Sequence, residues 1–289
     1  MKYKYIERNR LEFEVRKMCR ALGVSRSGYY GWRKDPMSRR EAEDELFLGE
    51  IREIYERSRK TYGSPRVHAE LREKGYVIGH NRVARLMKKN NIWSKVKKKF
   101  KVTTHSKHGR PVAKNLLKNI QVKRPNQAWV SDITYIRTYE GWLYLCIIMD
   151  LYSRNIVGWS MEDRLTKELV IKSLDMAYSS RRPEGGVIFH SDRGSQYASG
   201  GFKRSLMQKG FIASMSGKGN CYDNAYAESF FHTIKVEEVY ASVYRTRQEA
   251  KSSIFEYIEV FYNRVRKHSR LGYISPYQFE LQKELEKVA

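Results

Sequence analysis

The chain has 289 residues, with 56 Lys and Arg against 32 Asp and Glu, so its formal net charge is +24. This length favours two or three modules. The positive excess indicates a polyanionic partner, because Lys and Arg on phosphates release condensed counterions. A membrane-spanning role is not expected, since the longest uninterrupted apolar run, Leu143–Met149, is far shorter than the roughly 20 residues that a spanning helix needs.

The N-terminus and the cysteines argue against two further classes of protein. The N-terminus, MKYKYIERNR, lacks the apolar segment of a secretory signal, and the three cysteines form no CxxC pair. Neither a disulfide framework nor a zinc site is therefore expected. His105 and His108 have a ligand-like gap, but no cysteine pair follows them, so a solvated basic linker is their expected place. We expect a cytoplasmic protein.

The first third of the chain is predicted to be helical. Residues 8–34 fit a helix-turn-helix outline, with a helix, a break at Gly23, a cap at Ser25 and a second short helix. A longer helix is predicted over residues 41–59. Its apolar stripe is supplied by Leu46, Leu48, Ile51, Ile54 and Tyr55.

A second helix pair follows. Ser64 is placed to cap a helix that starts at Pro65 and stops at Gly75, and another helix begins near Asn81. The inner face of that last helix is formed by Val83, Leu86 and Met87. Its outer face carries Arg82, Arg85 and Lys89. A basic helix face beside an apolar one suits a DNA groove, and a merely solvated face is the alternative.

The stretch from Lys74 through Ser131 contains 16 Lys and Arg and no Asp or Glu. Within it, residues 95–112 show no regular apolar period, and we interpret them as a basic linker on DNA phosphates. The cations Lys97, Lys98 and Lys99 are its expected phosphate contacts. A solvated tail is the alternative. Both interpretations are correct if the linker is solvated in the free protein and becomes ordered on DNA.

After residue 124 the pattern changes to strands. The segments WVSDITYI, LYLCIIMDLY and NIVGWSM predict an antiparallel meander with turns near Glu140–Gly141 and Tyr152–Asn155. Asp150 precedes the second turn and is interpreted as structural. The later elements are a helix over 167–179, an interior strand at 186–192, a helix over 199–209, the strand FIASM, and a helix in NAYAESFFHTIKVEE with Asn220 or Asp223 as cap. The layout is a mixed α/β fold.

Three carboxylates stand out by their positions. Asp132 lies inside a β-rich strand where aspartate is disfavoured, Asp192 ends an apolar strand, and Glu228 sits in a helix where Ala225 and Ala227 leave space around it. Two Mg²⁺ ions about 4 Å apart stabilise the charge of phosphodiester cleavage, and such hard cations take oxygen ligands. One bridging aspartate and two flanking carboxylates suffice to hold them. Each carboxylate alone is equally explained as a cap, a surface charge or an ion-pair partner.

The residues around the carboxylates carry a resemblance. The segments WVSDITYI, HSDRGSQY and YDNAYAESFF, with Lys235 seven positions after Glu228, resemble the integrase-type core of IS3-family transposases, in the product of the second reading frame. Between Asp192 and Glu228, 35 residues intervene, which is similar to the D,D(35)E pattern shared with retroviral integrases. The segments at 150–159 and 262–279 fit as well, so the resemblance covers nearly the whole chain.

The resemblance implies a ribonuclease H-like mixed sheet with flanking helices, preceded by helix-turn-helix-like DNA-binding segments. It implies that Asp132, Asp192 and Glu228 bind Mg²⁺ or Mn²⁺, with two ions in each active site. The implied reaction is hydrolysis at the end of a mobile element, followed by attack of the 3′-hydroxyl on another phosphodiester. The family often has Pro where this chain has Cys221, which affects the loop before the helix and not the three carboxylates.

The resemblance also implies partners. Synapsis of two element ends implies a homo-oligomer, and a helix-turn-helix product of an upstream frame is often fused by frameshifting. Two other functions stay open: a transposase-derived DNA-binding regulator that no longer catalyses, and a ribonuclease H-like nuclease. The intact carboxylates argue against the regulator, and the long basic N-terminal half with Lys235 argues against the nuclease.

Further contacts to DNA are expected near the core. Asn224, Glu228, His232 and Lys235 share one helix face, so Asn224 and Lys235 are placed to hold the DNA end. The segment NRVRKHSR is interpreted as a DNA backbone contact, with plain solvation as the alternative. Its contact residues are Arg264, Arg266 and Lys267. The expected domains are 1–44, 45–94, the linker 95–124, the catalytic core 125–240 and a C-terminal helical region 241–289.

Overall fold

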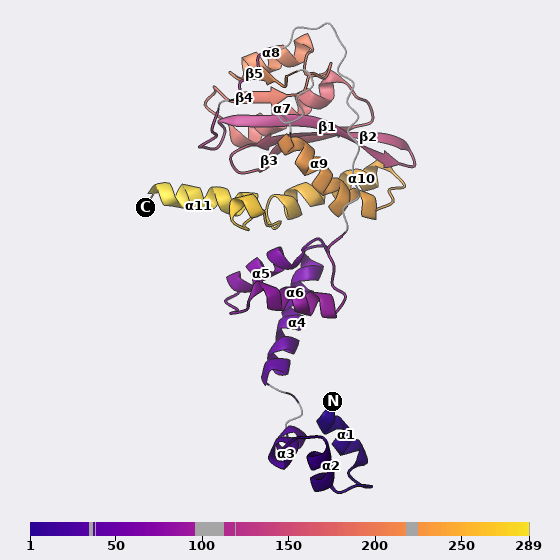
Figure 1. Cartoon of the computed structure of the whole chain (residues 1–289). Coiled ribbons are helices and arrows are strands. Elements are labelled where there is room, and N and C mark those ends of the chain that lie inside the picture. The colour runs from indigo at the N-terminus through magenta and orange to yellow at the C-terminus, as the bar shows by residue number, and fades with distance from the viewer. Residues whose placement is uncertain (35–36, 38, 96–112, 119, 218–224, 289) are drawn as a thin grey trace. The chain divides into compact units, whose positions relative to one another are not determined.

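A computed structural model of the chain describes residues 1–34, 37, 39–95, 113–118, 120–217 and 225–288 (Figure 1). The chain forms two compact units, Met1–Trp93 and Ser94–Ala289, and each is described by itself. Most of the predicted basic linker, including Lys97, Lys98 and Lys99, lies outside the described residues, as do Asn220, Asp223 and Asn224. No helix among the described residues is both long enough and apolar enough to cross a membrane.

The first unit begins with three short helices, α1 (Lys2–Asn9), α2 (Val15–Ala21) and α3 (Arg26–Lys34). The predicted break and cap are confirmed: Gly23 has φ +60°, and Ser25 Oγ accepts a hydrogen bond of 2.9 Å from the Gly28 amide at the start of α3. The two helices predicted on either side of Gly23 correspond to α2 and α3, and α1 is a further helix that was not predicted. The buried core of these helices is formed by Ile6, Met18, Cys19 and Tyr29.

The rest of the first unit comprises α4 (Arg39–Arg57), α5 (Ser64–Glu73) and α6 (His80–Lys89). The inner face of α6 is buried as predicted. Two local predictions were wrong. Helix α5 starts one residue early with Gly63 as its N-cap, so Ser64 lies inside the helix, where its Oγ is 3.1 Å from His80 Nε2. In α4 Leu46 is exposed and Phe47 is buried, so the apolar stripe is shifted. The expected boundary at 44/45 falls within α4.

The second unit is built on a five-stranded mixed sheet. Strands β1 (Ala128–Thr138), β2 (Gly141–Asp150) and β3 (Ile156–Glu162) form the predicted antiparallel meander. Strands β4 (Ile188–Ser191) and β5 (Ile212–Met215) run parallel to β1, and the order across the sheet is β3-β2-β1-β4-β5. β4 is therefore an interior strand, as expected. The turn between β1 and β2 requires the left-handed backbone of Gly141, with φ +109°.

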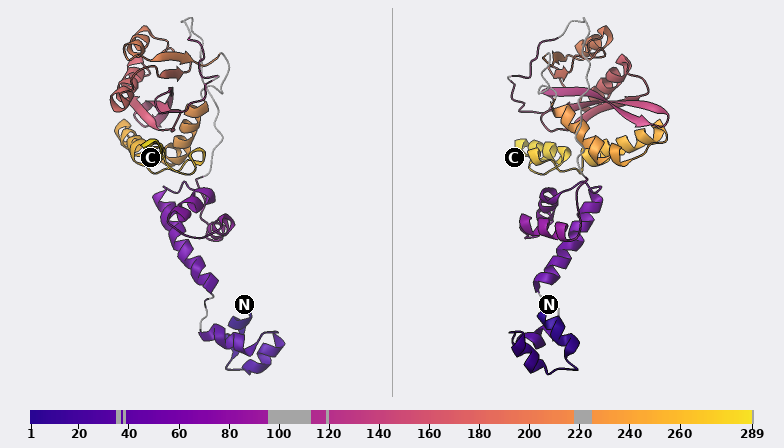
Figure 2. Two further views of the ribbon diagram at one scale, coloured as in Figure 1. Left: turned by 90° about the vertical axis from the view of Figure 1, so that its left-hand side faces the viewer. Right: turned by 45° about the vertical axis from the view of Figure 1, so that its right-hand side comes forward.

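Helices cover both faces of this sheet (Figures 1 and 2). Helix α7 (Lys167–Arg181) packs on β2 and β3, and α8 (Gly200–Gln208) packs on β5. Their core includes Trp129, Ile148, Leu174, Phe189 and Phe202. On the other side, α9 (Ala225–Glu237) packs on β1, and α10 (Arg247–Phe255) packs on β1 and β2. The sheet is thus buried on both faces, which leaves the strand ends for a site.

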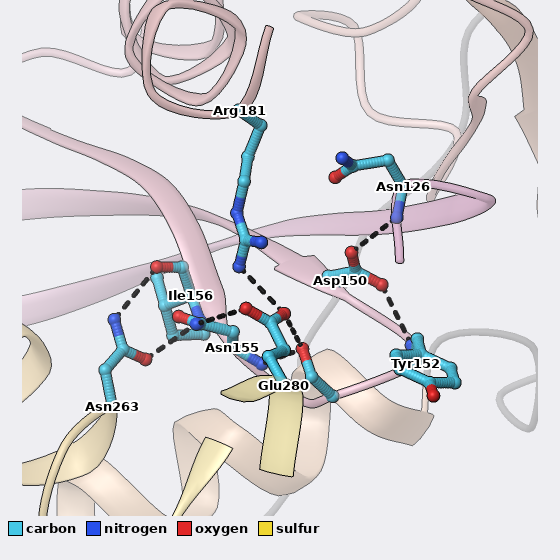
Figure 3. A network of polar contacts seen from close by, with 9 residues as sticks. Asn126, Asp150, Tyr152, Asn155, Ile156, Arg181, Asn263 and Glu280 are labelled. Atoms are coloured by element: carbon cyan, nitrogen blue, oxygen red, sulfur yellow. Dashed lines mark hydrogen bonds and ion pairs between the residues drawn. The ribbon is translucent and has the colours of Figure 1, made fainter. Parts of the chain in front are cut away.

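The C-terminal segment is attached to the same unit. It continues from α10 into a π-helical stretch (Glu256–Tyr262), a 3-10 helix (Ser269–Leu271) and α11 (Pro276–Val288). Helix α11 starts at Pro276, and Ser275 Oγ caps it by accepting a hydrogen bond of 3.2 Å from the Gln278 amide. The Glu280 carboxylate of α11 accepts hydrogen bonds from the Arg181 guanidinium at 2.9 Å and from the Asn155 side-chain amide at 3.4 Å (Figure 3).

Asp150 has the structural role that the sequence predicted. Its two carboxylate oxygens accept hydrogen bonds from the amides of Asn126 at 2.8 Å and Tyr152 at 2.9 Å (Figure 3). Burial raises the pKa of this carboxyl to about 6, although both amides oppose that shift. Asp150 therefore fixes the turn between β2 and β3 and is separate from the three candidate ligands.

Candidate active site

The register of two parallel strands brings Asp132 and Asp192 together. The last paired residues of β1 and β4 are Ser131 and Ser191, and each aspartate is the next residue on its strand. Neighbouring strands lie roughly 4.8 Å apart, and equivalent positions on parallel strands direct their side chains to the same face. The carboxyl end of β4 and the middle of β1 therefore present two carboxylates side by side, at the strand end where sites form in such sheets.

Backbone amides hold both aspartates in place. Asp132 Oδ1 accepts a hydrogen bond of 2.8 Å from the Ile133 amide, and Asp192 Oδ1 accepts one of 2.9 Å from the Gly194 amide. A Cβ at residue 194 would lie 2.9 Å from Asp192 Oδ1, so the glycine gives the carboxylate its space. Each aspartate keeps a second oxygen that these two bonds do not use.

Glu228 completes the set from α9, the helix that packs on β1. The pKa of Asp132 is well above its ordinary value, first because of burial and then because of the charge of Asp192, with a further contribution from Glu228. The Ile133 amide and Lys235 oppose this rise. Burial also raises the pKa of Glu228. Asp132 is therefore within electrostatic range of both Asp192 and Glu228.

Lys235 is buried, which differs from the expectation that it points openly toward substrate. Its side chain is 5% exposed, and Nζ lies 5.0 Å from the centre of the Tyr135 ring. Burial lowers the pKa of Lys235, while the Asp132 carboxylate acts in the opposite direction. The ammonium thus lies over the ring of Tyr135 on β1 and within electrostatic range of Asp132. Lys235 is thus part of the site as a partly desolvated cation.

The donor set fits a hard divalent cation. Three carboxylates are ligands that Mg²⁺ and Mn²⁺ prefer. Within the described ranges, no three His, Cys, Asp or Glu side chains are gathered tightly enough to hold one ion. Asp132, Asp192 and Glu228 are the residues that would hold such ions.

The basic face of α6 is largely neutralised inside the first unit. Arg82 pairs with Asp44 at 2.8 Å and with Glu43 at 3.1 Å, and Arg85 pairs with Asp44 at 2.7 Å. These partners lie on α4, about forty positions earlier in the chain. Within the part of the first unit that the structure describes, Lys89 is the one cation of the predicted outer face that is exposed and has no such pairing to α4. We therefore no longer assign Arg82 to DNA contact.

The predicted DNA contact at NRVRKHSR is also corrected. Arg266 and Lys267 are each 4% exposed, and the Arg266 guanidinium binds both oxygens of Glu237 at 2.8 and 2.7 Å. A buried guanidinium held in this way does not reach a phosphate backbone. Arg264 is exposed and lies over the Tyr277 ring at 5.8 Å, so it alone of the three keeps the predicted role.

Sequence reasoning missed the partners of these cations. Glu237 received no role, although it accepts hydrogen bonds from Arg266 and, at 2.7 Å, from the Tyr257 hydroxyl. The available signal was that Glu237 lies on the same face of α9 as the apolar Phe230 and Ile234, because a charge on a buried helix face needs a partner. Tyr135, beside Lys235, was expected only as a strand residue.

A mixed sheet with paired aspartates at a strand end and a glutamate on the covering helix is the core of an integrase-type polynucleotidyl transferase. The chain matches the family profile "Integrase core domain" over residues 122–221 and a second "Integrase core domain" profile over residues 228–283. Residues 41–100 match the profile "HTH-like domain". The first integrase core profile covers Asp132 and Asp192, and the second integrase core profile begins at Glu228.

Curated relatives cover almost the whole chain. A 31 kDa protein of insertion element IS600 from Shigella sonnei is 50% identical over 91% of this chain and 97% of its own length. The transposase InsF of insertion sequence IS3A from Escherichia coli is 42% identical over 97% of this chain and 98% of its own length. The catalytic core domain of BIV integrase is 16% identical, with a TM-score of 0.42 over 57% of this chain and 99% of that one. Because the similarity to the IS3A transposase covers nearly the full length of both chains, this chain belongs to the IS3 family of transposases.

Proposed function

We propose that the chain cuts DNA at the ends of a mobile element and joins the freed 3′-hydroxyl to another phosphodiester, with Asp132, Asp192 and Glu228 holding divalent cations. The observation that supports the proposal is the Ser131–Ser191 register, after which an aspartate follows in each segment, together with the packing on β1 of α9, which carries Glu228. Mg²⁺ is the proposed ion, with Mn²⁺ as a substitute, and two ions are proposed for each site.

The protein groups have distinct tasks. Bound cations would supply charge stabilisation for the attacking and leaving oxygens of an in-line displacement. Asp132 and Asp192 are oriented by the Ile133 and Gly194 amides, so their remaining oxygens are fixed before any ligand arrives. Lys235 places a positive charge next to Asp132, and we assign it to the phosphate of the DNA end.

Partners follow from the reaction. Two element ends and a target must be held together, so we propose a homo-oligomer on DNA, with an upstream-frame helix-turn-helix protein or fusion as an additional partner. The basic N-terminal unit, Lys89, the linker cations Lys97, Lys98 and Lys99, Asn224 and Arg264 are the proposed DNA contacts. The bacterial cytoplasm, where such an element resides, is the proposed compartment.

Amide variants of the three carboxylates test the mechanism. We expect Asp132→Asn, Asp192→Asn and Glu228→Gln each to abolish strand cleavage and joining while DNA affinity stays near that of the wild type. These changes keep the shape and remove the charge on which hard cations depend. Because clustered carboxylates repel one another, the free energy of unfolding is expected to stay unchanged or rise slightly. The measurement is metal-dependent cleavage of an element-end duplex.

Melting with and without Mg²⁺ gives an independent readout. Added metal is expected to raise the melting temperature of the wild type, and each amide variant should lose most of that rise. Asp163→Asn is the matched control, since Asp163 is an exposed carboxylate near the sheet and is expected to leave cleavage intact. One amide variant that cleaves at the wild-type rate would remove its residue from the site, and two would end the mechanism.

The same assays separate the other candidate functions. A regulator derived from a transposase would bind element ends and fail to cleave them in the wild-type form. A ribonuclease H-like nuclease would cleave RNA–DNA hybrids and ignore element ends. The family relationship and the three convergent carboxylates favour the transposase over both.

A further inference from the structure

Two half-exposed aromatic side chains lie beside the active site on the β1–β2 hairpin. Tyr135 is 44% exposed and Trp142 is 45% exposed, and their rings meet edge to face with centroids 5.0 Å apart. Tyr240, which is 51% exposed, follows α9 in the 3-10 helix Val239–Ala241 and is close enough for Tyr135 to raise its pKa, after burial as the main cause. We call Tyr135, Trp142 and Tyr240 the aromatic patch.

The topology of the sheet places this patch next to the carboxylates. Strand β4 stops pairing with β1 at Ser131, so β1 continues past it through Thr138 with only β2 as a neighbouring strand among the described residues. Tyr135 is three residues beyond Asp132, or about 10 Å along the strand. Lys235 connects the two points, because its ammonium lies over the Tyr135 ring and acts on the charge of Asp132.

Cations border the patch. Arg137 stands directly opposite Trp142 in the β1–β2 register and is exposed, and Arg247 Nε donates a hydrogen bond of 3.1 Å to the Trp142 carbonyl. With Lys235, three positive side chains surround the aromatic rings. Aromatic faces interleaved with Lys and Arg form the surface on which unpaired nucleotides stack while their phosphates are neutralised. A purely apolar protein partner would gain little from that border.

We propose that the aromatic patch binds an unpaired base of the DNA substrate, within the first few nucleotides beside the phosphate that is cut. The inference rests on the proposed function, which puts the scissile phosphate at the three carboxylates. Asp132 and Tyr135 lie about 10 Å apart along β1 with their side chains on opposite faces of the strand, and the Lys235 ammonium acts on both, which limits the base to the first few nucleotides beside the cut. The patch thereby holds the strand next to the cut open and in place.

The test couples one side chain to one base. In an element-end duplex, the base at each of the first four positions is removed in turn to leave an abasic nucleotide. At one position we expect the loss of the base to weaken wild-type binding and slow cleavage by about tenfold, within the range measured for base–aromatic stacking. Trp142→Leu is expected to show that loss already with the intact duplex and no further loss with the abasic one.

Two further variants keep the result interpretable. Trp142→Phe retains an aromatic face and is expected to keep most of the coupling, which covers the case in which leucine disturbs the hairpin. Phe255→Leu is the matched control: Phe255, the last residue of α10, is 49% exposed and forms an edge-to-face pair with Trp159 of β3, with ring centroids 5.9 Å apart. It should show no coupling to any base.

Distinct outcomes overturn the proposal. The proposal is refuted if the losses from Trp142→Leu and from the missing base are additive at all four positions, or if Phe255→Leu shows equal coupling. It is also refuted if Trp142→Leu changes the sedimentation mass, because the patch would then be a protein interface. The coupling between side chain and base is measured both in Kd and in cleavage rate. Failure of the proposed DNA-cutting function can therefore be distinguished from failure of the aromatic-patch proposal. If the wild type shows coupling in binding but does not cleave, the proposed function is refuted and the aromatic-patch proposal stands. If cleavage depends on Asp132 but no coupling is found, the proposed function stands and the aromatic-patch proposal is refuted.

Discussion

Glu237 and Arg266 form a buried ion pair that links α9, the helix of Glu228 and Lys235, to the C-terminal segment. The guanidinium binds both carboxylate oxygens, and the Tyr257 hydroxyl donates to the same carboxylate. The charge of Glu237 raises the pKa of Arg266 against the effect of burial. Glu237 lies two residues beyond Lys235, so this pair fixes the end of α9 that carries the site.

Removing one partner of this pair should be costly. Arg266→Met leaves the Glu237 carboxylate buried without its cation, and we expect the free energy of unfolding of the second unit to fall by roughly 3–5 kcal/mol. The measurement is urea unfolding followed by circular dichroism. Adding Glu237→Met to the same chain should recover most of the loss, because paired apolar residues of similar volume are tolerated.

Arg264→Met serves as the comparison two positions away. Its side chain is exposed, so the expected change lies within about 0.5 kcal/mol. A cost below about 1 kcal/mol for Arg266→Met would show that the pair is solvated in solution, and the predicted DNA contact at Arg266 would have to be reconsidered.

At the scale of elements, one glycine sets the distance between β3 and α7. A Cβ built on Gly158 would lie 2.4 Å from the Ser173 carbonyl oxygen and 2.6 Å from Ala177 Cβ. Both contacts are with the helix that covers the sheet, and the carbonyl is backbone and cannot rotate away. The close packing of strand and helix is therefore possible only without a side chain at residue 158.

Gly158→Ala is expected to destabilise the second unit by roughly 1–3 kcal/mol through overpacking. Gly201→Ala in the first turn of α8 is the matched control, since its nearest neighbour would be 3.5 Å from the new Cβ, an ordinary contact. Thermal unfolding of both variants, compared with the wild type, checks the difference. Equal melting temperatures for the two variants would mean that α7 can move away from β3 at little cost.

Local patterns predicted most of these elements. Alternation identified β1, and the apolar runs identified β2 and β3, because each strand carries its signal within itself. Asp132 was expected inside a strand and Asp192 at a strand end, yet the Ser131–Ser191 register that brings these two together depends on contacts 60 positions apart. Likewise, nothing near Arg82 in the sequence shows that Asp44 neutralises it, and nothing near Lys235 in the sequence shows that its ammonium lies over Tyr135.

At the scale of the whole molecule, positive charge is concentrated between Lys74 and Ser131, with 16 cations and no carboxylate in that stretch. Three of these cations are paired within the first unit: Lys74 binds Glu50 at 2.7 Å, and Arg82 and Arg85 bind the carboxylate of Asp44. A polyanion is the partner that such a stretch favours.

DNA binding by the full chain should therefore depend strongly on salt. If about six phosphates are neutralised, affinity is expected to fall by roughly a thousandfold between about 50 and 200 mM salt, because each neutralised phosphate releases condensed counterions. The measurement is the slope of log K against log salt concentration, taken with an element-end duplex and with an unrelated duplex. A flat response with both duplexes would contradict the phosphate-binding role of this stretch.

The slope also locates the cations that meet the phosphates. Replacing Lys97, Lys98 and Lys99 together by Gln should reduce its magnitude by about 2.7, at roughly 0.9 for each phosphate that is no longer neutralised. Arg82→Gln should leave the slope unchanged, because that guanidinium is held by Asp44 and Glu43, and should instead lower the stability of the first unit. The opposite pattern, with a reduced slope for Arg82→Gln and none for the lysine variant, would mean that DNA breaks the α4–α6 ion pairs and that α6 is the face that meets the phosphates.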